Sequence, residues 1–124
     1  MFKYDLKKRE ARSIIPEREK KTMRTIVLGK ESPLTVCAVG LGCVGMVSEY
    51  PPIPEKKDMI RFAREAFEQE ETFFDTAEAY GPYTGEEILG EALREVRDQV
   101  KIATKFGFAI QNGISVGLDS RPET

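Results

Sequence analysis

The sequence predicts an α/β fold in which helices cover one or both faces of a parallel sheet. Short β-rich runs alternate with two amphipathic segments, and glycine or proline marks most of the boundaries between them. The order along the chain is strand, helix, strand, helix, strand, with short connections. This alternation is typical of parallel strands joined by crossover helices.

The first third of the chain is expected to form strands. Residues 24–29 and 34–36 are rich in strand formers, and the turn-prone residues 30–33 between them predict a hairpin over 24–36. A buried strand is expected over 37–42. Pro51, Pro52 and Pro54 then exclude a helix before about residue 54.

Two helices and two further strands are predicted next. A helix over 55–70 has one apolar face, which consists of Met59, Ile60, Ala63, Ala66 and Phe67. A second helix over 84–97 begins with the capping-box pattern Thr84 to Glu87 and has a stripe of Ile88, Leu89, Ala92, Leu93 and Val96. Strands are expected over 72–75 and 100–105, a loop over 106–119, and the start of another helix over 120–123.

Composition limits the class of protein. The chain has 124 residues, is 40% hydrophobic and carries a formal net charge of −2, which suits one ordinary domain or a piece of a larger one. Apolar runs fall short of the ~18 residues of a membrane span, and the N-terminus lacks a secretory pattern. We therefore expect a cytoplasmic protein without a membrane partner. Cys37 and Cys43 are expected to be buried thiols, neither disulfide-bonded nor metal-bound.

Charge divides the chain near residue 22. Residues 1–24 contain nine Lys and Arg against four acidic residues, whereas 25–124 contain ten against seventeen. Residues 1–22 show no sustained apolar face, so we expect a disordered charged extension followed by one domain over 23–124. Nucleic acid is not an expected partner, because aromatic residues do not interleave with the basic ones.

Three chemically distinct side chains should meet at one edge of the sheet. Asp75 ends the strand over 72–75, Lys105 ends the strand over 100–105, and Tyr80 follows Asp75 by five residues. Neighbouring strands lie about 5 Å apart, so the two charged strand ends should be adjacent. A carboxylate, an ammonium and a phenol gathered in this way predict a site of proton transfer.

The run from Gly40 to Gly45 matches the pattern G-x-G-x-x-G of dinucleotide-binding Rossmann folds. That fingerprint requires a helix to open at the last glycine, and the prolines from Pro51 onward argue against one. The favoured interpretation is a glycine-rich strand end that a ligand or another backbone approaches closely. A Rossmann fold stays open as the minor alternative.

The chain resembles the N-terminal portion of an aldo-keto reductase. The matching pieces cover residues 24–124 in order and at the family's spacing; they are 40–46, 72–81, 86–93, 102–107 and 119–123. The resemblance implies the N-terminal part of a (β/α)8 TIM barrel, about three β/α units and incomplete. It also implies reduction of aldehydes and ketones to alcohols with NADP(H).

The resemblance assigns roles to individual residues. The family uses a tetrad of Asp, Tyr, Lys and His, and Asp75, Tyr80 and Lys105 match the first three. Gly42, Cys43 and Val44 match the loop that lies against the cofactor, and Asp75 also lies near its nicotinamide ribose. Two departures stand out: Glu70 and Glu71 replace a usual Gly and apolar residue, and Val44 replaces a common Met.

The sequence contains no histidine, so the fourth member of the tetrad is missing from these 124 residues. The phosphate site of such barrels lies after strands 7–8, beyond the three units expected here. We therefore expect a truncated reductase that is inactive alone and binds NADP(H) weakly or not at all. The alternative is a non-catalytic barrel fragment or cofactor-binding subunit that docks on a complementing chain.

Overall fold

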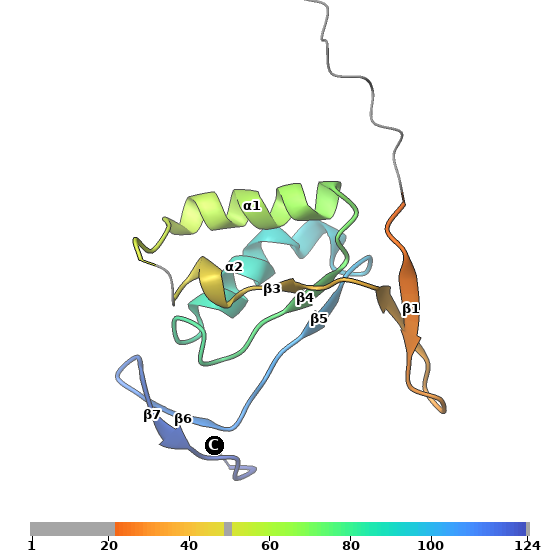
Figure 1. Ribbon diagram of the computed structural model, residues 1–124. Helices are drawn as coiled ribbons and strands as arrows, with labels where there is room; N and C mark the ends of the chain where they lie inside the picture. The colour runs from red at the N-terminus through yellow and green to blue at the C-terminus, as the bar shows by residue number, and fades with distance from the viewer. Residues whose placement is uncertain (1–21, 49–50, 124) are drawn as a thin grey trace, which may run out of the picture.

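The computed structural model describes residues 22–48 and 51–123. The disordered extension predicted for 1–22 therefore falls, apart from Thr22, outside the described residues. Figure 1 shows a small central sheet with two helices on one side and a hairpin at each end of the described chain. The elements are β1 (Thr25–Leu28), β2 (Leu34–Cys37), β3 (Leu41–Gly42), η1 (Val44–Met46), α1 (Lys56–Glu68), β4 (Phe73–Asp75), α2 (Thr84–Ala92), η2 (Arg94–Val96), β5 (Lys101–Ala103), β6 (Phe108–Gln111) and β7 (Ile114–Leu118).

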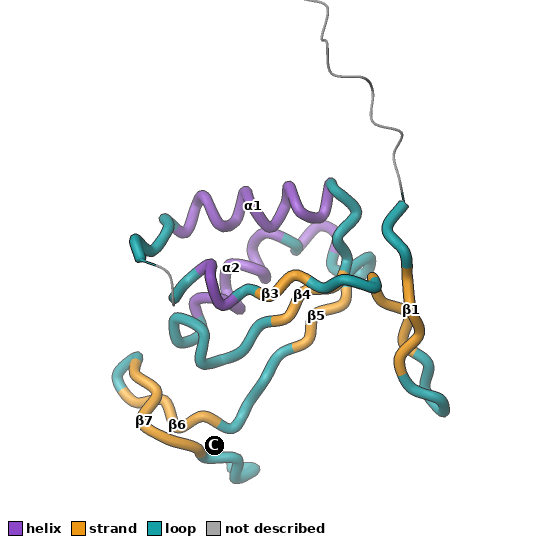
Figure 2. The backbone as a smooth tube through the Cα atoms, in the orientation of Figure 1, coloured by secondary structure: helices purple, strands orange, loops and turns teal. Residues whose placement is uncertain are grey.

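The central sheet has the order β3-β4-β5, and both of its strand pairs are parallel. Gly42 lies opposite Asp75, and Asp75 lies opposite Ala103. Helix α1 connects β3 to β4 and α2 connects β4 to β5, on the same side of the sheet (Figure 2). The predicted alternation of parallel strands and helices is therefore confirmed, and the three strands form an open sheet that closes no barrel within the described residues.

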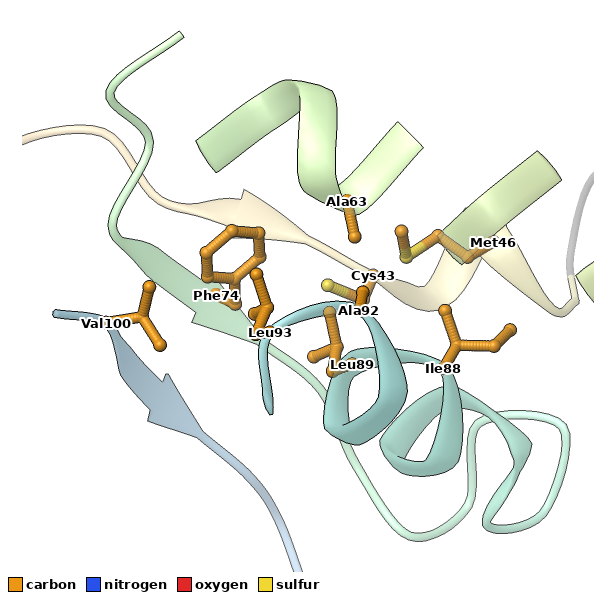
Figure 3. Close-up of a cluster of buried hydrophobic side chains, with 9 residues drawn as sticks. All are labelled: Cys43, Met46, Ala63, Phe74, Ile88, Leu89, Ala92, Leu93 and Val100. Atoms are coloured by element: carbon orange, nitrogen blue, oxygen red, sulfur yellow. The ribbon is translucent and has the colours of Figure 1, made fainter. Parts of the chain in front are cut away.

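The core lies between this sheet and the two helices, and Figure 3 shows its members. Phe74 is completely buried at its centre, and Ile88, Leu89 and Leu93 of the second predicted stripe are 1% exposed. The cluster consists of Cys43, Met46, Ala63, Phe74, Ile88, Leu89, Ala92, Leu93 and Val100. Of the stripe predicted on α1, only Ala63 is fully buried; its other members are half-buried and pack against the cluster.

The N-terminal hairpin is antiparallel, with Thr25 opposite Cys37 and Leu28 opposite Leu34. This confirms the predicted hairpin over 24–36. Cys37 and Cys43 are both buried free thiols, as expected. The strand predicted over 37–42 is shorter than expected, since Cys37 still belongs to β2 and only Leu41 and Gly42 pair with β4.

The glycine-rich run ends a strand and opens no α-helix. Val44–Met46 forms one 3-10 turn, and residues 51–54 are not helical. A Rossmann fold is therefore excluded at this position. Gly40 has a packing reason to lack a side chain, because a Cβ there would lie 2.9 Å from Cδ1 of Phe73.

The prediction of a loop over 106–119 is wrong, because β6 and β7 form an antiparallel hairpin there. Gln111 lies opposite Ile114, and the two residues between them, Asn112 and Gly113, have φ of 50° and 74°. These are the positive angles of a type I′ turn, for which Asn-Gly is the preferred sequence. The Asn112-Gly113 pair is therefore the sequence signal for this hairpin.

The predicted capping box is also wrong. Tyr83, with a left-handed φ of 67°, is the N-cap of α2, and Thr84 is the first helical residue without a side-chain capping bond. At the C-terminal end, α2 stops at Ala92, and the 3-10 turn η2 takes up part of the range that was predicted as helix. The described residues 120–123 show a turn at 122–123 rather than a helix.

Within residues 22–48 and 51–123, no helix has both the length and the apolar character that crossing a membrane requires.

Helix α1 ends in a Schellman motif that carries glutamate where glycine is usual. Glu70 has a φ of 68°, its N–H donates to the carbonyl oxygen of Phe67, and the N–H of Glu71 donates to that of Ala66. Glycine adopts this left-handed conformation without the steric cost that a Cβ brings. The sequence therefore retains a strained residue at the turn between α1 and β4.

We expect Glu70→Gly to raise the free energy of unfolding by about 0.5–1 kcal/mol, because it relieves the left-handed strain. Urea unfolding followed by circular dichroism measures this change. Gln69→Gly is the matched control, since Gln69 has a φ of −87° and gains nothing from glycine. A loss of stability in Glu70→Gly would mean that the bond from the Met23 N–H to Glu70 Oε2, at 3.3 Å, outweighs the strain.

Candidate functional site

The three side chains singled out in the sequence meet at the carboxyl edge of the central sheet. Lys105 Nζ donates hydrogen bonds to Asp75 Oδ1 at 2.5 Å, to the carbonyl oxygen of Thr76 at 2.9 Å and to Tyr80 Oη at 3.1 Å. An ammonium has three donors, and these acceptors use all of them. The side chains of Asp75 and Lys105 are each 45% exposed, so the cluster is open to solvent from one side.

Backbone hydrogen bonds continue beyond the strands and hold this cluster in place. The Cys43 N–H donates to the carbonyl oxygen of Asp75 at 2.9 Å, and the Thr76 N–H donates to that of Ala103 at 2.8 Å. The Glu78 N–H reaches the carbonyl oxygen of Lys105 at 3.2 Å. The parallel pairing thus extends past the assigned ends of β4 and β5 and places Lys105 beside the loop that carries Tyr80.

Tyr80 lies in the tight loop of residues 76–83 (the Tyr80 loop), which connects β4 to α2. Its N–H donates to the carbonyl oxygen of Ala77, and its own carbonyl oxygen accepts from the Gly85 N–H, both at 3.0 Å. Lys105 Nζ also lies 4.8 Å from the centroid of the Tyr80 ring, within the range of a cation–π contact. The phenol is therefore fixed at its backbone by the loop and at its oxygen by the ammonium.

The electrostatics of the cluster favour a charged lysine. The hydrogen bond to Asp75 raises the pKa of Lys105 above its ordinary value, and the bond to Tyr80 adds to this, whereas partial burial opposes it. Lys105 consequently stays an ammonium throughout the neutral range. An ammonium that donates to the oxygen of a phenol leaves the phenol's own O–H free to point elsewhere.

The residues predicted to face a cofactor divide between the surface and the core. Gly42 is exposed, Val44 is half-buried, and the Cβ direction of Gly42 meets nothing within 4 Å. The Cys43 side chain is instead completely buried, with its Sγ donating to the carbonyl oxygen of Leu41 at 3.4 Å. The Cys43 side chain thus packs in the core beneath residues 42–44. Its thiol does not face the carboxyl edge of the sheet, where Asp75, Tyr80 and Lys105 lie.

Burial also governs the chemistry of the Cys43 thiol. Removal from water raises its pKa from 9.0 to about 11, and the negative charge of Asp75 contributes in the same direction. The thiolate is the reactive form of cysteine. Cys43 is therefore an inert structural thiol at neutral pH.

Sequence reasoning missed two residues beside the cluster. Thr76 supplies the carbonyl oxygen that Lys105 contacts, and its own Oγ1 is buried without a hydrogen-bond partner in the described part of the chain. Glu78 accepts a hydrogen bond from the Phe108 N–H at 2.8 Å. Their position directly after a strand that ends in Asp75 was the available signal, since functional groups gather at such strand ends.

A cavity of about 240 Å³ lies between the loop that carries Tyr80 and the β6–β7 hairpin. Aromatic residues Tyr83, Phe106 and Phe108 line it together with Glu78 and Asp119. The β6–β7 hairpin, which was predicted as loop, thus forms one wall of this cavity, and Glu78 and Tyr83 line it from the loop that carries Tyr80.

Comparisons with known proteins agree on one family. Residues 38–121 match the model of the aldo/keto reductase family. The chain is 36% identical over 89 residues to a probable aldo-keto reductase 1 of Glycine max, an alignment that covers 71% of this chain and 26% of the relative.

Solved structures of the same family have a similar fold. The holo form of aldo-keto reductase AKR11C1 from Bacillus halodurans aligns with a TM-score of 0.66 and 28% identity, over 78% of this chain and 30% of that one. A putative aldo-keto reductase from Pseudomonas aeruginosa aligns with a TM-score of 0.61 and 29% identity, over 82% and 38%. The chain thus spans about a quarter to two fifths of the length of these relatives.

We expect native Cys43 to resist alkylation. At pH 8, a pKa of about 11 instead of 9.0 lowers the thiolate fraction ~100-fold, and burial blocks access further. Iodoacetamide labelling of Cys37→Ala, followed by mass spectrometry with and without urea, measures this difference. Equal labelling rates in native and unfolded protein would contradict the assignment of Cys43 to the core.

The same pKa shift predicts how stability depends on pH. Between pH 9.0 and about 11 the unfolded chain loses the Cys43 proton while the folded chain keeps it. The free energy of unfolding contributed by this group is therefore complete below pH 9 and falls as pH rises through that window. Comparing Cys43→Ala with the parent chain across these pH values isolates the contribution, which the variant should lack.

Two glycines of α2 should respond differently to alanine. Alanine is favoured over glycine in a helix by about 1 kcal/mol, and Gly90 has nothing within 4 Å of its Cβ direction. At Gly85 a Cβ would lie 3.2 Å from the Tyr80 Cβ, from the Tyr80 carbonyl oxygen and from Thr76 Oγ1. We expect Gly90→Ala to stabilise the fold in urea unfolding and Gly85→Ala to gain clearly less. Equal gains in the free energy of unfolding would show that the loop around Tyr80 shifts to accommodate the added methyl group at little cost.

Proposed function

This chain belongs to the aldo/keto reductase family, and from that premise we propose that it supplies the proton-donating part of a carbonyl reductase site. The proposed reaction is the NADPH-dependent reduction of an aldehyde or ketone to an alcohol. Tyr80 is the proton donor, Lys105 stabilises the resulting phenolate, and Asp75 holds Lys105. The rest of the site, including the residue in the role of the family's histidine, comes from outside these 124 residues, which contain no histidine.

The observation that supports this role best is the direction of the bond between Lys105 and Tyr80. Lys105 Nζ is the donor and Tyr80 Oη the acceptor, at 3.1 Å. The phenol therefore keeps its O–H for a carbonyl oxygen of the substrate. When that proton leaves, the electron pair stays on Tyr80 Oη, 3.1 Å from a positive charge that favours it.

In the proposed step the cofactor and Tyr80 act on the two atoms of the substrate's carbonyl group. When bound, a reduced nicotinamide would supply a hydride to the carbonyl carbon of the substrate. The carbonyl π electrons move to the oxygen as the Tyr80 O–H bond breaks and a new O–H bond forms. Asp75 keeps its charge throughout and acts only by orienting Lys105, whose Nζ lies 2.5 Å from Asp75 Oδ1.

The geometry of residues 42–44 supports the proposal that the nicotinamide end of NADP(H) binds at the carboxyl edge of the sheet. Gly42 lies opposite Asp75 in the sheet, is exposed, and leaves open space where a Cβ would project. Val44 follows in the 3-10 turn, and Cys43 fixes the loop from the core side. We assign Gly42, Val44 and Asp75 to contact with the cofactor's ribose and nicotinamide, and Cys43 to support of that surface.

Exposed apolar residues on the β6–β7 hairpin and on the segment before it favour a second function, which is docking on another chain. Phe106 is 82% exposed and Leu118 is 83% exposed. Exposed large apolar residues of this kind suit contact with a complementing chain. In this alternative the chain docks on a partner barrel, with or without cofactor, and takes no part in turnover.

We expect Tyr80→Phe to lower turnover by roughly 10²–10⁴-fold, because general acid catalysis contributes that much. The assay follows NADPH oxidation with a simple aldehyde. It uses a chimeric barrel in which residues 24–121 replace the corresponding segment of the Bacillus halodurans reductase. Lys105→Met should lower turnover as well.

Lys101→Met is the matched control, because Lys101 lies four residues earlier in β5 and outside the cluster. It should leave turnover within a few-fold of the parent chimera. An active chimera that ignores Tyr80→Phe would overturn the proposed role. A correctly folded chimera without any turnover would favour the docking alternative.

A further inference from the structure

One glutamate connects the three segments that surround the proposed proton donor. The Glu78 N–H donates to the Lys105 carbonyl oxygen at 3.2 Å, and the Glu78 carbonyl oxygen accepts from the Tyr83 N–H at 2.8 Å. Its side chain accepts from the Phe108 N–H at 2.8 Å through Oε1. Glu78 therefore contacts the Lys105 segment, the end of the Tyr80 loop and the start of β6.

We propose that Glu78 is a positioning residue whose carboxylate, by holding the start of β6, keeps Lys105 Nζ in contact with Tyr80 and Asp75. An effect of Glu78 on turnover rests on the proposed function. Its effect on the position of the Lys105 side chain does not.

The segment after β5 has little packing to hold it. Thr104, Lys105 and Phe106 are all exposed, the last at 82%. Burial of apolar surface, the main stabilising contribution elsewhere in the fold, is therefore small over these residues. Hydrogen bonds at the two ends of the segment must fix its path.

Glu78 supplies a bond at both ends. Its N–H holds the Lys105 carbonyl group, and its carboxylate holds the Phe108 N–H three residues further on. Between them Gly107 turns the chain with a φ of 98°, a conformation that side chains other than glycine rarely adopt. A flexible glycine without the Phe108 bond would allow the segment, and Lys105 with it, to swing away from Tyr80.

The chemistry of the carboxylate suits this role. A hydrogen bond from a backbone N–H to an ionised acceptor is roughly twice as strong as one between neutral groups. Glu78 is half-buried, so solvent competes less for this bond than for one on the surface. The bond also joins the β6–β7 hairpin to the site, because Phe108 is the first residue of β6. A separate bond, from the Asp119 N–H to the carbonyl oxygen of Gly107, closes the base of the hairpin.

Glu86 provides a matched comparison at the same segment. Its Oε1 accepts from Thr104 Oγ1 at 2.6 Å, one residue before Lys105. That bond joins two side chains and leaves the backbone of the segment unrestrained. Removing Glu86 therefore takes away a nearby carboxylate without releasing the Phe108 end.

The experiment titrates Lys105 by NMR in the full chain with ¹³C-methylated lysines, and Lys105→Arg assigns the signal. Glu78→Ala and Glu78→Met, which lack an acceptor oxygen, should return the Lys105 pKa toward that of an exposed lysine. Glu78→Gln, which keeps one acceptor oxygen, and Glu86→Ala should retain the raised pKa. Hydrogen exchange at the Phe108 amide, read in the same samples, should accelerate only in Glu78→Ala and Glu78→Met.

Two outcomes would overturn the proposal. In the first, the Phe108 amide exchanges freely in Glu78→Ala and Glu78→Met while the Lys105 titration stays unchanged. In the second, Glu78→Gln loses the raised Lys105 pKa although its Phe108 amide stays protected, which would mean that the charge of Glu78 acts through space and not through its hydrogen bond. If Glu78→Ala fails to fold, Glu78→Met, which preserves the side-chain length, carries the comparison.

Turnover in the chimeric barrel separates this proposal from the proposed function. Loss of Lys105 positioning should lower turnover by up to roughly 10²-fold, with rescue by Glu78→Gln. Insensitivity of turnover to Tyr80→Phe would sink the reductase role and leave the Lys105 titration result standing. An unchanged Lys105 titration would sink the role of Glu78 and leave Tyr80 as the donor.

Discussion

The parallel register of β4 and β5 is the constraint on which the candidate site depends. Asp75 pairs with Ala103, and the pairing continues through the bond from the Thr76 N–H to the Ala103 carbonyl oxygen. Because side chains alternate between faces, Ala103 and Lys105 lie on one face of their strand, directly beside Asp75. A shift by one residue would send Lys105 to the opposite face of the sheet, away from Asp75 and Tyr80.

Because of the same alternation, neighbouring residues of β4 contribute in turn to the hydrophobic core and to the candidate site. Phe74 points into the core and is fully buried, whereas Phe73 and Asp75 on either side of it are half-buried. The helices pack against the Phe74 face, so substitutions there act on folding. The Asp75 face carries the cluster, so substitutions there act on the site with little loss of packing.

Local sequence patterns were sufficient to predict those parts of the fold that depend on nearby residues alone. The alternating strands and helices, the buried stripe of α2 and the meeting of Asp75 with Lys105 followed from periodicity and strand order. The barrel itself came from family resemblance, because three parallel strands fit several α/β folds. The errors were local as well: a type I′ turn at Asn112 was overlooked, and Tyr83 took the N-cap position that the pattern assigned to Thr84.

The contacts that sequence could not reveal are those made by backbone atoms. Lys105 uses the Thr76 carbonyl oxygen as its third acceptor, and Glu78 holds the next segment through a backbone N–H. Every residue type except proline offers both of these backbone groups, so no pattern of side chains marks them.

Backbone acceptors have a consequence for the chemistry. With Asp75 and the Thr76 carbonyl group occupying two donors of Lys105, only one remains, and the phenol oxygen of Tyr80 receives it. A lysine with a spare donor would be free to turn toward solvent at this open rim. Occupying all three donors is therefore what keeps a long and flexible side chain beside the proton that the site is proposed to deliver.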